Sequence, residues 1–147
     1  MNISGFPYFI DKVAFVKGYG DNGKVQEIAE QLWAQLDNNA DWFFDVMAVI
    51  SVLLCWLYYG PYNKKKSGRP YKLRWLLGFG VLASIIVGVV TFVWCNSFFD
   101  SLDDVNGVRM HISLINSLCA LAVYALASVI TCLFFPTNAY RWLPKVM

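Results

Sequence analysis

The sequence has few charged residues. Asp, Glu, Lys and Arg make up only 15% of its 147 residues, against roughly a quarter in an average soluble protein. Hydrophobic residues reach 58%, which argues against a water-soluble globule because too little polar surface remains to cover a core. The net charge is only +2, so the balance of charge gives no support for a nucleic-acid partner. This composition predicts a small integral membrane protein.

Residues that could carry out chemistry are also scarce. There is one histidine, His111, and the four cysteines form neither a CxxC pair nor a metal-ligand spacing. The first 17 residues have no basic region ahead of an apolar core, so we do not expect a removable signal peptide. Residues 18–23 match the G-x-G-x-x-G pattern of dinucleotide-binding proteins. The sequence that follows leaves no room for the second parallel strand that such a binding unit needs. We therefore expect no enzyme activity, no cofactor and no metal.

Three long apolar segments dominate the remainder. They cover residues 42–59, 73–99 and 112–135, close to the ~20 helical residues that cross a hydrocarbon layer of ~30 Å. Such a segment must be helical in lipid, because its backbone N–H and C=O groups find no water there. Trp42 and Tyr59 mark the two ends of the first segment, as aromatic residues at the headgroup level do. The predicted fold class is an all-α integral membrane protein with three transmembrane helices.

The charges between these spans predict their orientation. The segment 60–74 carries bases and no acid, whereas the connection 96–111 has three Asp against one Arg, and the tail 136–147 has two bases and no acid. By the positive-inside rule, loop 60–72 and the tail are cytoplasmic and the N-terminus is not. The expected location is the bacterial inner (cell) membrane, although the rule applies to eukaryotic membranes as well. Six bases are expected to set the topology and to contact lipid headgroups: Lys64, Lys65, Lys66, Arg69, Lys72 and Arg74.

The first 41 residues contain an expected amphipathic helix at 24–37 on the non-cytoplasmic side. Apolar residues recur there at steps of three and four, which is the helical period, and Asn38–Asn39 offers a stop before the first span. Lys24 is the only base among several acids on the polar face, unlike the basic face of a helix that binds anionic lipid. We expect the apolar face to bind a protein partner. Its four large side chains are Ile28, Leu32, Trp33 and Leu36.

Small and polar side chains recur at three- or four-residue steps in the second and third spans, and such strips permit close helix packing. The candidate packing residues are Gly80, Ser84 and Gly88 in the second span and Ser113, Ser117, Ala120, Tyr124 and Ser128 in the third. We expect the two strips to meet or to serve neighbouring chains. A polar strip can alternatively line a water-filled path, but such a path usually needs a buried ionisable group. The only acid within a span is Asp45, near its outer end.

Together these features predict a non-enzymatic, small polytopic subunit of a membrane assembly, such as a secretion, respiratory or phage-related complex. Its expected partners are membrane lipids and either other membrane proteins or further copies of the chain, with no nucleic acid. Two alternatives fit the same topology. One is a holin-like, self-assembling membrane pore, because three spans in this orientation resemble one class of holin in architecture. The other is an immunity protein against a membrane-active toxin.

Overall fold

The computed structural model of the chain describes four stretches, which are helical apart from Gly18 and Gly107. These stretches are residues 12–18, 23–62, 73–98 and 107–134. A six-residue helix, α1 (Lys12–Lys17), comes first and is followed by the 35-residue helix α2 (Gly23–Leu57). A π-helical turn, η1 (Tyr58–Tyr62), continues α2. The predicted tail, and loop 60–72 beyond Tyr62, lie outside the described residues.

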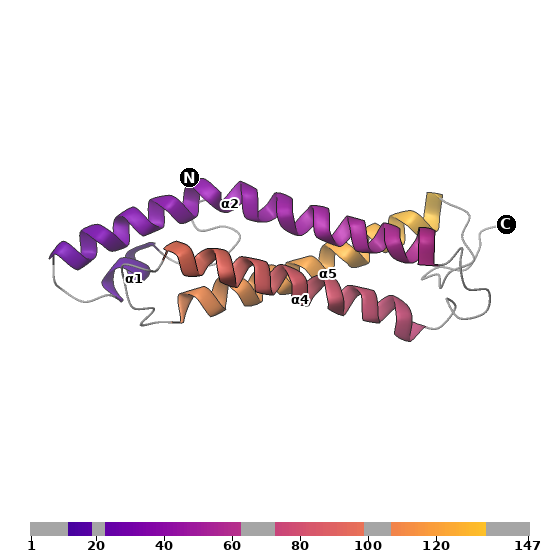
Figure 1. Ribbon diagram of the computed structural model, residues 1–147. Helices are drawn as coiled ribbons and strands as arrows, with labels where there is room; N and C mark the ends of the chain where they lie inside the picture. The colour runs from indigo at the N-terminus through magenta and orange to yellow at the C-terminus, as the bar shows by residue number, and fades with distance from the viewer. Residues whose placement is uncertain (1–11, 19–22, 63–72, 99–106, 135–147) are drawn as a thin grey trace.

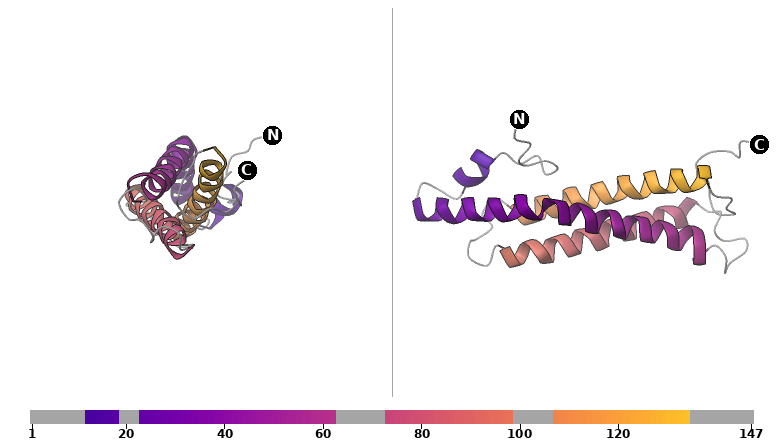
Figure 2. Two further views of the ribbon diagram at one scale, coloured as in Figure 1. Left: turned by 90° about the vertical axis from the view of Figure 1, so that its right-hand side faces the viewer. Right: turned by 90° about the horizontal axis from the view of Figure 1, so that it is seen from above.

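Two further long helices complete the fold. They are α4 (Leu73–Phe98) and α5 (Val108–Phe134). Helices α2, α4 and α5 lie side by side as a bundle in which each contacts the other two, and α1 lies beside the first part of α2 (Figures 1 and 2). Helix α2 and helix α5 run in the same direction, and α4 runs in the opposite direction (Figure 1).

The prediction of an all-helical chain with three helices long and apolar enough to cross a membrane is confirmed. The segments that qualify are Asp41–Tyr62, Leu73–Ser97 and Val108–Leu133. The third begins four residues before the predicted Ile112. Gly107 directly precedes this helix, and its φ of 62° lies in the left-handed region that suits glycine. Its carbonyl oxygen then accepts a hydrogen bond from the backbone N–H of His111, at 3.0 Å, in the first turn of α5.

The predicted stop at Asn38–Asn39 is wrong, because α2 runs unbroken through this point. The side-chain Nδ2 of Asn39 donates to the carbonyl oxygen of Gln35 at 2.7 Å, one helical turn back, so it does not redirect the backbone. The apolar stripes before and after this point are also in phase. Buried side chains continue along one side of α2 at Ala29, Trp33, Leu36, Phe43, Met47 and Leu54.

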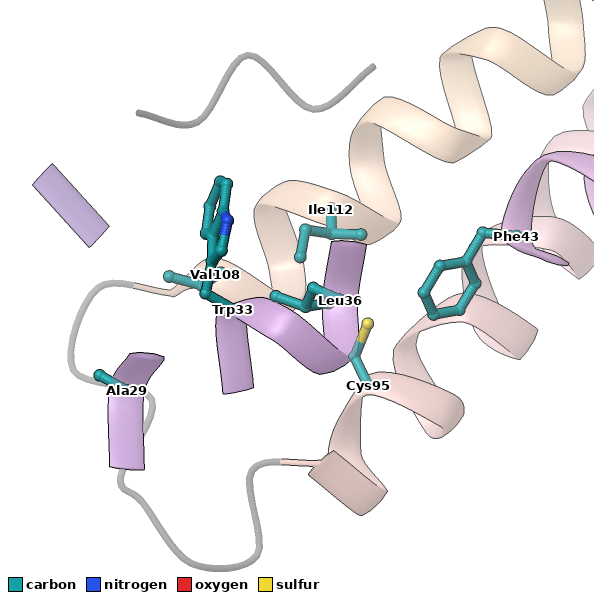
Figure 3. Close-up of a cluster of buried hydrophobic side chains, with 7 residues drawn as sticks. All are labelled: Ala29, Trp33, Leu36, Phe43, Cys95, Val108 and Ile112. Carbon is teal, nitrogen blue, oxygen red and sulfur yellow. The ribbon is translucent and has the colours of Figure 1, made fainter. Parts of the chain in front are cut away.

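Helix α2 extends past the neighbouring ends of α4 and α5 (Figures 1 and 2). At 1.5 Å per residue, its length is about 52 Å, against about 40 Å for α4 and for α5. Residues 23–40 of α2, which we call the projecting half, are anchored by a set of side chains that we call the Trp33 cluster (Figure 3). It consists of Ala29, Trp33, Leu36 and Phe43 from α2, Cys95 from α4, and Val108 and Ile112 from α5. Val16 of α1 packs against this cluster.

A second set of buried side chains, the Tyr58 cluster, lies at the opposite end of the bundle. It consists of Leu54, Cys55, Tyr58, Tyr59, Leu76, Ala83 and Tyr124. The π-helical turn brings both Tyr58 and Tyr59 into this cluster, although adjacent residues of an α-helix point about 100° apart. Pro61 accounts for the wider turn, because its ring clashes with the carbonyl four residues earlier and it has no N–H to donate.

Candidate functional site

The small-residue strips of the second and third spans face each other in the structure. Ser113 Oγ donates a hydrogen bond to the carbonyl oxygen of Gly88 at 2.6 Å, and Ser117 Oγ donates to the carbonyl oxygen of Ser84 at 2.9 Å. Both acceptors are backbone carbonyls that already belong to the α4 helix. A side chain reaches such a carbonyl only when the two helices lie close together, so these bonds show a tight α4–α5 contact.

Two glycines make this close approach possible. A Cβ atom built on Gly80 would lie 3.0 Å from Cδ1 of the Tyr124 ring, and one built on Gly88 would collide with Ser117 Oγ. Tyr124 therefore lies directly against the backbone of α4 at Gly80. Any larger residue at Gly88 displaces the hydroxyl that binds the Ser84 carbonyl. Further along this interface, Asn116 Nδ2 donates to Thr91 Oγ1 at 3.2 Å.

Part of the strip on α5 contacts α2 instead of α4. Ser51 Oγ of α2 donates to the carbonyl oxygen of Ala120 at 3.2 Å. Tyr59 Oη lies 2.6 Å from Ser128 Oγ and 3.3 Å from Cys132 Sγ. Ala120 and Ser128, which we expected on the face toward the second span, thus help to bind the first.

The α2 side of this contact was missed by the sequence analysis. Ser51, Cys55 and Tyr59 recur at four-residue steps, and this spacing was the signal that could have revealed it. Cys55 Sγ contributes a longer contact of 3.8 Å with Thr131 Oγ1. Polar residues therefore lie on both sides of α5, which is the helix that binds the other two.

Every buried serine, threonine and asparagine side chain in the described part of the chain has a hydrogen-bond partner. These residues are Ser51, Thr91, Ser113, Asn116 and Ser128. Buried polar side chains that are paired in this way hold helices together, whereas a water-filled path needs unpaired polar surface. Elsewhere in the described part of the chain, two buried side-chain atoms have no partner, Trp75 Nε1 and Tyr124 Oη. Asp45 is exposed, and no three described His, Cys, Asp or Glu side chains are grouped to hold a metal ion.

The residues expected to bind a partner lie mostly against the chain itself. Trp33 and Leu36 are 6% and 5% exposed within the Trp33 cluster, and Ile28 packs against that cluster. The side chain of Leu32 lies outside the described part of the structure. The face of this segment that remains accessible is therefore its polar face.

Of the six bases expected to set topology, only Arg74 is described. The other five are in residues 63–72, which lie outside the described stretches: Lys64, Lys65, Lys66, Arg69 and Lys72. Arg74 is exposed at the start of α4, and its Cζ atom lies 5.8 Å from the ring centroid of Trp75. This distance is within the range of a cation–π interaction.

Comparison with known proteins finds no matching family model, no matching curated protein and no matching solved structure.

The close α4–α5 contact predicts that Gly88→Ala destabilises the bundle. The added methyl group would displace the Ser117 hydroxyl from the Ser84 carbonyl, and overpacking of this kind costs about 1–3 kcal/mol. We expect a lower free energy of unfolding for the protein in mild detergent. Gly78→Ala is the matched control, because no atom lies within 4 Å of a Cβ at this position of the same helix. An equal effect of the two substitutions would contradict the close contact.

Two of the buried tyrosines, Tyr59 and Tyr124, are expected to respond differently to the loss of the hydroxyl. Tyr59→Phe removes the bond to Ser128 and should lower the free energy of unfolding by about 1 kcal/mol. Tyr124→Phe removes a buried hydroxyl that has no partner among the described residues. It should leave stability unchanged or raise it, because an unpaired buried hydroxyl is unfavourable. Thermal unfolding of the two variants in the same detergent compares them directly, and equal losses would show that Tyr124 Oη is hydrogen-bonded.

Proposed function

We propose that this protein is a non-enzymatic subunit of a membrane assembly, and that it binds a partner through the projecting half of α2. One observation carries the proposal. Residues 23–40 continue the first candidate span as one unbroken helix, and the start of this helix extends past the neighbouring ends of α4 and α5 (Figure 1). The Trp33 cluster anchors the apolar side of this segment. Its opposite side faces away from the bundle and is available to another protein.

The accessible side of this segment is acidic. Five acids of α2 are exposed, and Lys24 is the only base within this helix. The acids are Glu27, Glu30, Asp37, Asp41 and Asp45. Three of them, at positions 37, 41 and 45, lie one turn apart on one face, and like charges at this spacing disfavour a helix by a few tenths of a kcal/mol per pair. A partner with a basic surface would relieve this repulsion, so we propose that the complementary surface is basic.

The proposed orientation places the projecting half on the non-cytoplasmic side. The acids of α2 lie at one end of the bundle, and Arg74 lies at the other end, where the sequence continues from the basic segment 60–72. The positive-inside rule assigns the basic end to the cytoplasm. The proposed location remains the bacterial inner membrane.

The surface of the bundle does not favour the alternative of a self-assembling pore. A pore made of several copies needs a polar helix face toward its centre. Between positions 46 and 57 of α2, 77 and 93 of α4, and 114 and 133 of α5, every described side chain that is exposed is apolar or glycine. The polar groups at these depths are instead used in bonds between the helices of one chain.

Orientation can be tested by labelling a cysteine introduced on each side. We expect Ser67→Cys in the basic loop to be protected from a membrane-impermeant thiol reagent added outside spheroplasts, and Gln31→Cys on the projecting half to react. The unsubstituted chain is the control for its own cysteines, of which Cys55 and Cys95 are buried and Cys119 and Cys132 half-buried. The opposite labelling pattern would reverse the orientation.

Partner binding can be tested by removing the charge of the exposed face. Glu30→Gln, Asp37→Asn and Asp41→Asn together keep the size of each side chain and remove three negative charges. If each surface ion pair contributes about 0.5–1 kcal/mol, the loss of three pairs should weaken binding of the partner by about tenfold or more. The measurement is recovery of co-purified proteins from native membranes in mild detergent, quantified by mass spectrometry.

The matched control changes uncharged side chains of the same exposed segment. Gln31→Ala, Gln35→Ala and Asn38→Ala alter the surface without altering its charge, because all three side chains are exposed. This control should recover the same proteins as the unsubstituted chain. Recovery that is unchanged in the acidic triple variant, or a ring containing only copies of the chain, would contradict the proposed subunit.

A further inference from the structure

The buried side of the projecting half continues toward its free end. Helix α2 begins beyond the neighbouring ends of α4 and α5 (Figure 1), and Ala29 lies about 6 Å nearer to that beginning than Trp33 does. In the Trp33 cluster, Ala29 and Phe43 lie on opposite sides (Figure 3). Ala29 is nevertheless 0% exposed, and Ile28 beside it packs against the same cluster. This end of the apolar side is therefore covered as well.

Helix α1 lies at this end of the cluster. It runs beside the first part of α2 (Figures 1 and 2), and the side chain of its Val16 packs against the Trp33 cluster. Val16 is half-buried there, whereas Val13 of the same helix is 56% exposed. In the described part of the chain, α1 is thus the element placed to cover the apolar side of the projecting half near Ala29.

Helix α1 is too short to be stable by itself. It has six residues, and isolated helices of fewer than about 12–15 residues are marginal in water. Its helical form therefore depends on its contact with the rest of the chain. Five residues, 18–22, join α1 to α2, and a short tether keeps a detached segment at an effective concentration in the millimolar range. Helix α1 can therefore leave α2 and return to it readily.

The chemistry of α1 resembles that of the partner proposed above. The helix has a lysine at each end, four apolar residues between them and no acid. The projecting half offers the complement of both features, because its buried side is apolar and its exposed side carries Glu27, Glu30 and Asp37. A short segment that is apolar and basic therefore suits this part of α2 by burial and by charge.

We propose that α1 is a detachable cover on the apolar side of the projecting half, and that an apolar, basic segment of the partner takes its place. In the free protein, α1 keeps Ala29 and its neighbours from water. When the partner segment replaces α1, the same apolar side contacts the partner. The replacement rests on the proposed function, because the incoming segment belongs to the basic partner proposed there. The cover is a property of this chain alone.

The cover can be measured by labelling a cysteine at Ala29 in the full-length protein in mild detergent. The Ala29→Cys variant is treated with a polar maleimide, and mass spectrometry of its peptides gives the rate at this position. Because Ala29 is 0% exposed when α1 is in place, the rate reports the fraction of molecules in which α1 is detached. It should be much lower than the rate of Gln31→Cys, which lies on the exposed side of the same segment.

Substitutions in α1 show whether this helix is the cover. Val16→Asp removes the buried side chain and places a charge against an apolar cluster, so it should speed the labelling of Ala29→Cys by about fivefold or more. Val16→Ala should speed it by a smaller factor. Val13→Asp is the matched control, because it adds the same charge to the same helix at an exposed position, and it should leave the rate unchanged. Equal rates in the two Asp variants would overturn the proposal.

Replacement of α1 can be tested with a peptide of residues 12–20 of this chain, acetylated and amidated at its ends. It is added at millimolar concentration, to match the tethered segment, to the protein that carries both Ala29→Cys and Val16→Asp. The peptide should slow the labelling toward the rate measured with Val16 in place. The same peptide with the Val16→Asp change should not slow it. If neither peptide slows the labelling, a second segment cannot take the place of α1.

These measurements contain no partner, so they are separate from the recovery experiment above. A labelling rate that does not respond to Val16→Asp contradicts the cover, even if partner recovery depends on the acids of α2. A working cover in a protein that recovers no partner would contradict the proposed subunit and leave α1 as a cover of the chain by itself.

Discussion

Close contact between α4 and α5 depends on two glycines, and the position of the third helix depends on that contact. The hydrophobic effect drives water-soluble helices together, but it gives no such force between helices that are surrounded by lipid. In the membrane location that we propose, packing and hydrogen bonds therefore hold the bundle. Gly80 receives the Tyr124 ring, and Gly88 leaves room for the hydroxyl of Ser117. Without these two close approaches, the serine hydroxyls of α5 could not reach the carbonyls of α4.

Helix α2 is held by different forces at its two ends. In the span it binds α5 through the Ser51–Ala120 and Tyr59–Ser128 hydrogen bonds. In the projecting half, where we propose that water surrounds the helix, burial of Trp33 and Leu36 can itself stabilise the contact. Because the buried positions stay in phase from one half to the other, one continuous helix satisfies both. This is the physical reason that α2 does not break at Asn38–Asn39.

Much of the fold was predictable from the sequence because its strongest signals are averaged over long continuous segments. Twenty apolar residues in a row indicate a span whatever packs beside it, and the spacing of Gly80, Ser84 and Gly88 indicates a close helix contact. The choice of neighbour was harder to predict. Residues four apart advance about 40° around a helix, so the strip on α5 winds from α4, at Ser113, to α2, at Ser128.

The candidate binding face was predicted less well, for a related reason. An apolar stripe shows that a helix is buried on one side, but it does not identify the protein that buries it. Trp33 and Leu36 are buried by Val108 and Ile112 of the same chain, which lie more than 70 residues later. The partners of Ser51 and of the Trp33 cluster could not be inferred from local periodicity, because each contact joins segments that are distant in the sequence.

The same contacts fix the direction in which the exposed face of α2 points. A shift of α2 by one residue along its axis would rotate it by about 100°. Ser51 and Tyr59 would then lose their partners on α5, and Trp33 would leave its buried position. These losses would occur together because α2 is a single unbroken helix. The acids of the projecting half therefore keep a fixed direction relative to α4 and α5, and a partner bound there would be held in a defined orientation to the whole bundle.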